Sequence, residues 1–337
     1  MKKKIISFYR KNKKIILFLV RITISVTLIA FLIKTQLKDF RSVIEILKSS
    51  NKILLLLSLS THIFGTWITA FRWKTLLNTQ KVRLSTGTLS ITVLIGQFFN
   101  NFLPTSIGGD VFRTYDASKK AKIPLSVSAS VIVVERFSGV VSAAVYAVVA
   151  LFLGFTAIGN RSVIIPIVIF FVITVILAFL IINPSVFRLG KFKFMRKMRE
   201  KLSNVYNTLV SFKKYKVVLL KVLVYGFLLQ FAVILNWYLA ARALGINLTL
   251  TAFIFIVPVV STIAMIPISI GGIGLRENSL VFIMVAMGVA NEKAALCSLL
   301  IFSMLILIGM VGGIIYIVRP YFESRSKKAT PESLDNH

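Results

Sequence analysis

Long apolar stretches separated by basic connections dominate this chain. A helix needs about 20 consecutive apolar residues to cross a bilayer. Segments of that length lie at residues 15–33, 53–71, 124–153, 162–183, 217–242 and 292–318. Two further apolar stretches, 84–103 and 249–266, each run into a short motif rich in proline and glycine. The pattern predicts an all-α polytopic membrane protein with about six full spans.

The basic connections set the predicted orientation. The tail 1–14 and the connection 184–216 are densely basic, and the positive-inside tendency places both in the cytoplasm. The polar tail 321–337 falls on the same side. Between these segments lie two transmembrane halves, 15–183 and 217–320. We therefore expect a multi-pass protein of the cytoplasmic membrane with both termini in the cytoplasm.

Charge also decides what the two shorter apolar stretches do. Segments 72–83 and 113–122 are both basic, so 84–103 should enter and leave the membrane on the cytoplasmic side. With its motif it forms a re-entrant hairpin, 84–113. Its counterpart, 249–277, would enter from the outside. The sequence thus predicts two oppositely facing re-entrant hairpins and an inverted internal repeat.

One stretch conflicts with this orientation. Residues 34–52 carry several cations, yet the predicted topology places them outside. Their apolar residues recur at helical spacing, which is typical of an amphipathic helix lying on the membrane surface. The alternative is a different topology at this point. A similar amphipathic pattern in 184–216 predicts an interfacial helix on the cytoplasmic side.

A ten-residue pattern, P-x-S-I-G-G-x-x-x-R, occurs once in each half. The first motif runs from Pro104 to Arg113 and the second motif from Pro267 to Arg276. Proline and paired glycines break helices, and arginine is costly in hydrocarbon, so this combination is expected where it lines a cavity. Matching breaks in two halves are typical of transporters with internal repeats.

Two adjacent charges lie near the middle of the predicted span 124–153. Glu135 and Arg136 point about 100° apart on a helix, so each needs a partner from elsewhere or a water-filled cavity. We interpret both as functional. A purely structural ion pair between helices is the alternative.

The first motif holds the ingredients of an anion site. Gly108 and Gly109 precede Asp110, a good N-cap, and Arg113 follows one turn later. Backbone N–H groups at such a helix start bind anions, and an arginine adds a bidentate grip on phosphate. The carboxylate of Asp110 competes for the same donors. The alternative is that Asp110 only caps the helix and Arg113 only anchors the topology.

The second motif differs in its acid. It has Gly271, Gly272 and Arg276 but no carboxylate matching Asp110, and Glu277 follows the arginine instead. No cluster of basic residues surrounds Arg276 and Glu277. An anchor that only fixes the membrane orientation is therefore a poor explanation for them.

Other polar residues limit the chemistry further. Asn100 and Asn101 precede the first motif, where their amides either satisfy the broken backbone or contact a head group. With two histidines, Cys297 as the single cysteine and four aspartates, the chain offers no metal-ligand cluster. We expect neither a metal nor a cofactor.

Composition supports a membrane protein. Hydrophobic residues make up 57% of the 337 residues, and the mean hydropathy is +0.86. A net charge of +30 would indicate nucleic-acid binding in a soluble protein. Here the cations lie mostly between apolar runs, where they attract anionic lipid head groups. Membrane phospholipids are therefore the expected partners, and nucleic acid is not.

The motifs together resemble a known family. Asn101 to Arg113, then Glu135-Arg136, then Pro267 to Glu277 are similar to the lysylphosphatidylglycerol synthase transmembrane family, the flippase-like domain at the front of the multiple-peptide-resistance factor. The resemblance covers about residues 10–320. It implies a module that moves lipids, in that relative aminoacylated phosphatidylglycerol, between leaflets. The relative's soluble synthase domain has no counterpart before His337, so we expect no lysyltransferase activity.

The sequence therefore predicts a lipid flippase for an anionic or aminoacylated phospholipid, or for a polyprenyl-linked lipid. The predicted head-group ligands are Asn100, Asn101, Gly108, Gly109, Arg113, Arg136, Gly271, Gly272 and Arg276, with Asp110, Glu135 and Glu277 as charge-balancing or ion-coupling residues. Two alternatives stay open. One is a membrane enzyme of the phosphatidylglycerol lysyltransferase type that uses these carboxylates. The other is a partner subunit that delivers lipid to a separately encoded synthase or glycosyltransferase, with 184–216 as its docking surface.

Overall fold

All regular structure in the described part of the chain is helical. The computed structural model describes residues 19–20, 22–37, 40–102, 108–154, 172, 211–264 and 268–329. The predicted tail 1–14, almost all of the span 162–183 and most of the connection 184–216 lie outside these residues.

Four helices are long and apolar enough to cross a membrane. They are α3 (Lys52–Thr79), α6 (Leu125–Gly154), α10 (Lys216–Ala243) and α13 (Asn291–Ala329). They match the predicted spans that begin at residues 53, 124, 217 and 292. The first predicted span, 15–33, overlaps a shorter apolar helix, Ile22–Gln36. The prediction of an all-α polytopic membrane protein is thereby confirmed.

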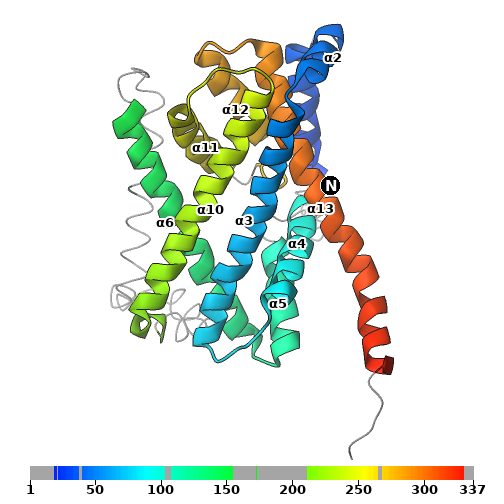
Figure 1. Cartoon of the computed structure of the whole chain (residues 1–337), viewed down its shortest axis with the longest axis vertical. Helices are drawn as coiled ribbons and strands as arrows, with labels where there is room; N and C mark the ends of the chain where they lie inside the picture. Colours follow the sequence, from blue (N-terminus) through cyan, green and yellow to red (C-terminus); the bar gives the residue numbers. More distant parts are fainter. Residues whose placement is uncertain are drawn as a thin grey trace, which may run out of the picture.

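Shorter helices flank each proline–glycine motif. They are α4 (Thr86–Phe102) and α5 (Gly108–Ala121) in the first half, and α11 (Leu250–Ala264) and α12 (Leu275–Ala286) in the second. Figure 1 shows α4 and α5 in the lower half of the bundle and α11 and α12 in the upper half. The chain therefore interrupts its helices at both motifs, and the two pairs of short helices extend toward opposite ends of the molecule.

Polar caps and buried amides hold the long helices in place. Asn51 caps α3, because its side-chain oxygen accepts the N–H groups of Ile53 and Leu54 at 3.0 and 3.1 Å. Further along α3, Ser58 exchanges hydrogen bonds of 2.6 to 2.9 Å with Asn236 of α10, in the buried interface between the two helices. Such interhelical hydrogen bonds stabilise packing in a lipid environment, where apolar burial gives little preference between helix and lipid contacts.

Glycines bring α13 very close to α4. A β-carbon at Gly312 would collide with the carbonyl of Leu94, and one at Gly313 would lie 2.7 Å from the ring of Phe98. Small residues are typical of tightly packed transmembrane helices. Because α13 also packs on α12, this contact joins the two halves of the molecule.

The short helix α2 (Phe40–Ser49) falls within the amphipathic stretch predicted at 34–52. Val43 is buried, whereas Ile44 and the cations Arg41 and Lys48 are exposed. Figure 1 shows α2 at the upper end of the bundle, beside the start of α3. One face thus packs on the protein and the other is free to meet an interface.

Candidate functional site

Five charged residues from three helices form one cluster, which we call the charge network. Its members are Arg72 of α3, Asp110 and Arg113 of α5, and Glu135 and Arg136 of α6. Helix α6 packs against both α3 and α5. The network therefore depends on tertiary packing rather than on local sequence.

Glu135 is the buried centre of the network. Its side chain is 2% exposed, and its two oxygens accept hydrogen bonds from Arg72 Nη2 at 3.0 Å and Arg113 Nη2 at 2.6 Å. A carboxylate removed from water in this way is tolerated only when it is paired and hydrogen-bonded. Two arginines satisfy that condition here.

Arg136 has a different partner. Its Nε and Nη2 bind the two oxygens of Asp110 at 2.6 and 2.8 Å, a bidentate arrangement. The side chain of Arg136 is 56% exposed, whereas that of Asp110 is 11% exposed. Arg113 lies 3.7 Å from Asp110 as well, so it links the two ion pairs. As expected from their spacing, Glu135 and Arg136 each bind a residue from another helix.

The network contains more hydrogen-bond donors than acceptors. Arg72 Nε and Nη1, Arg113 Nε and the indole N–H of Trp73 are buried without a hydrogen-bond partner. The guanidinium of Arg113 lies 4.4 Å above the Trp73 ring, a cation–π contact. Three arginines face two carboxylates, so the network carries one excess positive charge. These buried N–H groups are suited to donate hydrogen bonds to an anionic group.

The glycines of the first motif serve close packing. A β-carbon at Gly109 would collide with the carbonyl of Gly96 and lie 2.7 Å from Asn100 Cγ. The N–H of Gly109 donates to Asn100 Oδ1 at 2.8 Å. The side-chain amide of Asn100 thus satisfies a backbone N–H group beside the helix break, which is one of the two roles considered for it. Gly108 is buried beside it, at the start of α5.

Asn101 has a similar backbone role. Its Nδ2 donates to the carbonyl of Leu305 in α13 at 3.1 Å. Residues 103–107 lie outside the described residues, so the proline of the first motif is not placed.

The second motif is held by a local ion pair. Glu277 is 1% exposed, accepts the N–H of Gly274 at 2.6 Å and accepts Arg276 Nε and Nη2 at 2.8 and 2.6 Å. Glu277 therefore caps α12 as well as balancing Arg276. Gly271 and Gly272 have φ values of +57° and +77°, which side chains other than glycine rarely adopt.

The two motifs meet at the end of α4. A β-carbon at Gly271 would lie 3.4 Å from the carbonyl of Asn100, the residue whose side chain binds Gly109. One residue of α4 thus contacts the paired glycines of both halves.

Helix Ile22–Gln36 supports the second motif. The N–H of Ile270 donates to Ser25 Oγ, and Asn278 Nδ2 donates to the carbonyl of Leu28, both at 3.0 Å. Sequence analysis did not identify these contacts, because isolated serines and asparagines carry no signal of their own.

Sequence analysis also missed Arg72. It stands between Trp67 and Trp73 near the end of a predicted span, a pattern typical of an interfacial anchor. Arg72 is buried because α3 packs on α6, and the sequence does not show this contact.

Asp116 is a second residue that the sequence did not single out. It accepts Thr92 Oγ1 at 2.6 Å and Arg319 Nη2 at 2.9 Å, which joins α5 to α4 and α13. Aspartate is scarce in this chain, which has four, and that scarcity could have drawn attention to Asp116.

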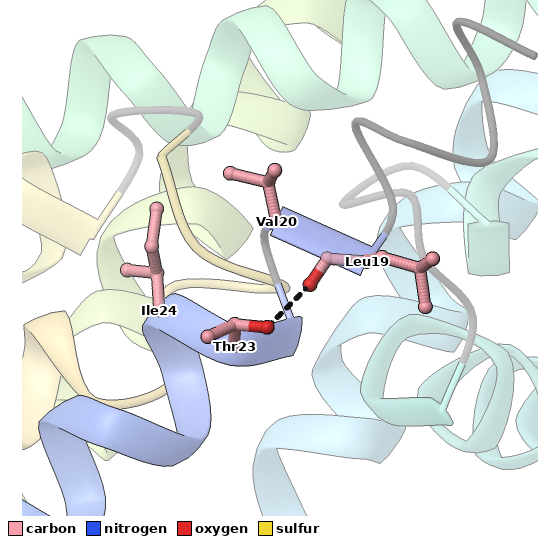
Figure 2. A pocket seen from close by; sticks show the side chains of 4 residues that line it. All are labelled: Leu19, Val20, Thr23 and Ile24. Atoms are coloured by element: carbon pink, nitrogen blue, oxygen red, sulfur yellow. Dashed lines mark hydrogen bonds between the residues drawn. The ribbon is translucent and has the colours of Figure 1, made fainter.

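A pocket lies beside the start of the first described helix. Figure 2 shows its lining side chains, Leu19, Val20, Thr23 and Ile24. The Thr23 hydroxyl donates to the Leu19 carbonyl at 3.0 Å, so the lining is apolar in character. It suits a hydrocarbon chain rather than a charged head group. Among the described residues, no group of three or more metal-ligating side chains comes together.

These features define a polytopic helical membrane protein in which broken helices surround buried ion pairs. The family described as the lysylphosphatidylglycerol synthase TM region matches residues 18–313, and this chain belongs to that family. The resemblance seen in the motifs is thereby confirmed. The chain is also similar to a UPF0104 membrane protein of Methanocaldococcus jannaschii, with 32% identity over 95 residues. That match covers 28% of this chain and 28% of the relative.

Proposed function

We propose that this protein is a lipid flippase that moves the head group of a phospholipid or polyprenyl-linked lipid between the leaflets of the cytoplasmic membrane. The observation that carries the proposal is the charge network, which gathers three arginines and two carboxylates where the membrane-spanning helices α3 and α6 meet the short helix α5. Charges inside such helices are costly and typically mark a transport pathway. Membership of the family and the paired helix breaks support the same conclusion.

In this proposal Arg136 makes the first contact with the head group. It is the exposed member of the network, and its bidentate hold on Asp110 is the geometry that also suits a phosphate. The phosphate binds Arg136 beside Asp110, which keeps its ion pair, and gains access to Arg113 behind it. Arg276 provides a further cation on the side of the second motif. The acyl chains stay in the bilayer throughout.

The paired helix breaks suggest that the lipid path lies between two symmetry-related halves. We propose that α4–α5 and α11–α12 are re-entrant hairpins of an inverted repeat, entering from opposite membrane faces. Their placement toward opposite ends of the bundle supports this arrangement (Figure 1). The α3–α4 connection and the end of α5, which carry Lys81, Arg83, Lys119 and Lys122, face the cytoplasm by the positive-inside tendency.

The described carboxylates favour transport over an enzymatic role. Asp110, Glu135 and Glu277 are each engaged by an arginine at 2.6 Å. A general acid or base needs a carboxyl group placed within hydrogen-bond reach of the proton that it transfers, and these carboxylates are already occupied by ion pairs. Binding and charge balance therefore fit these residues better.

The test is a leaflet-accessibility assay in proteoliposomes, with labelled phosphatidylglycerol, its lysyl form and a short-chain polyprenyl phosphate. We expect the wild type to move at least one of these lipids, and Arg136→Ala to lower that rate at least about tenfold, the effect of losing one charge-assisted contact. Arg242→Ala is the matched control, because Arg242 is an exposed arginine of α10 bound only to Asn247 in the described contacts. An unchanged rate in folded Arg136→Ala protein would refute the proposed site.

A further inference from the structure

The charge network has a net charge that restricts its ligand. Arg72, Arg113 and Arg136 contribute three positive charges, and Asp110 and Glu135 contribute two negative charges. Removing charge from water is costly, and opposite charges in a low-dielectric site offset that cost only when they balance. A ligand with one net negative charge brings the network to neutrality. A zwitterionic ligand leaves the excess unchanged, and a cationic one enlarges it.

The network also lacks a place for an ammonium group. In the described part of the chain the buried carboxylates are Asp110, Glu135 and Glu277, and each is held by an arginine at 2.6 Å. An aminoacyl ammonium would have to displace one of these guanidinium groups. The hydrogen-bonding groups left over are all donors: Arg72 Nε and Nη1, Arg113 Nε and Trp73 Nε1. Donors match phosphate oxygens and do not match another donor.

We infer, on the basis of the proposed function, that the head group accepted by the charge network is a phosphodiester with one net negative charge and no ammonium group. Phosphatidylglycerol is the simplest lipid of this class. A phosphomonoester of charge near −2 exceeds the available positive charge by one. Lysyl-phosphatidylglycerol has a net charge near +1, so it adds to the excess positive charge of the network instead of neutralising it.

The charge of the network can be altered with little damage to the fold. Asp110→Asn raises the net charge to two, and the arginine that it releases, Arg136, is 56% exposed and so is not left buried without a partner. Asp116→Asn is the matched control. It lies on the same helix and also loses one negative charge and one arginine contact, that of Arg319, but it lies outside the network.

The experiment measures binding of dihexanoyl forms of phosphatidylglycerol, lysyl-phosphatidylglycerol, phosphatidylcholine and phosphatidic acid to the detergent-solubilised protein by native mass spectrometry. We expect wild-type protein to bind the phosphatidylglycerol probe about tenfold more tightly than the lysyl and choline probes. Asp110→Asn should shift the ratio of phosphatidic acid to phosphatidylglycerol binding about tenfold toward phosphatidic acid. Asp116→Asn should leave that ratio unchanged.

The inference is overturned if the lysyl probe binds as tightly as phosphatidylglycerol, if no probe binds, or if Asp116→Asn shifts the ratio as much as Asp110→Asn does. Should Asp110→Asn not fold, Arg136→Gln gives a network of zero net charge and should lose the preference for phosphatidylglycerol over phosphatidylcholine. Flipping is measured in parallel. Charge-dependent binding without flipping refutes the proposed function alone, and flipping without charge-dependent binding refutes this inference alone.

Discussion

The two halves of the molecule carry the same motif but use its arginine differently. In the first half, Arg113 reaches across to Glu135 on another helix and shares it with Arg72. In the second half, Arg276 binds the next residue in the chain, Glu277, which also caps α12. The first arrangement needs three helices in place and leaves an excess positive charge. The second is local and neutral. A repeated sequence motif can therefore form an ion pair between helices in one half and a local helix cap in the other.

The largest effect should follow from removing the centre of the charge network. Glu135→Ala leaves Arg72 buried without a counter-charge and leaves Arg113 with only the more distant Asp110 at 3.7 Å, so we expect the free energy of unfolding to fall by about 3–5 kcal/mol. Unfolding in mixed detergent micelles measures the change. Glu45→Ala, at an exposed position on α2, is the control and should change stability by less than about 0.5 kcal/mol. Equal effects of the two substitutions would show that the network contributes nothing to the fold.

A smaller effect should come from the glycines, and it should differ between the motifs. Gly109→Ala forces a methyl group against the carbonyl of Gly96, so α4 and α5 must separate, at a cost of about 2–3 kcal/mol. Gly271→Ala meets Asn100 at an ordinary 3.4 Å and is penalised mainly by its φ of +57°, at about 1–2 kcal/mol. Thermal unfolding of the purified variants gives both values.

Gly87→Ala serves as the reference for these two variants. Gly87 lies in α4, and an added β-carbon there meets no atom within 4 Å. We expect it to be neutral or slightly stabilising, because alanine is the better helix former. If Gly87→Ala destabilised the protein as much as Gly109→Ala, helix packing would not be the cause.

An effect as small as that of Gly271→Ala should come from the ion pair of the second motif. Glu277→Ala removes the cap of α12 and the partner of Arg276, for an expected loss of about 1–2 kcal/mol. Glu277→Gln keeps an acceptor for the Gly274 N–H and should lose about half as much. The same unfolding assay applies to both. A loss as large as that of Glu135→Ala would mean that the second ion pair is not a local support, and the contrast between the halves would fail.

Sequence reasoning identified charged residues well where a local rule applied. Glu135 and Arg136 stood out because charges are rare inside apolar segments, and the spans were found from their length alone. Partners could not be deduced in the same way, because the contact between Glu135 and Arg72 depends on how α3 packs on α6. The Glu277 cap could have been predicted, since an acid three residues after a helix start is a known capping pattern.

The tryptophans explain why the sequence does not single out Arg72. Trp67 and Trp73 flank Arg72 at a change from apolar to basic sequence, which is the usual mark of a membrane interface. In the structure Trp73 is fully buried and stacks on Arg113, while Trp67 is 56% exposed. Two tryptophans of one helix thus have opposite environments, and only the packing of neighbouring helices distinguishes them.

The glycine contacts of α4 determine which parts of the protein can move. Gly312 locks α13 onto α4, and Gly109 locks α5 onto it, in both cases with a glycine pressed against a backbone carbonyl. Interfaces packed this closely do not slide gradually. We therefore expect helices α4, α5 and α13 to move together. The ion pairs of Asp110 and Arg113 with α6 cross the boundary of this group. In the proposed flippase these ion pairs would act as a latch, because they have to break before α6 can move away from the group.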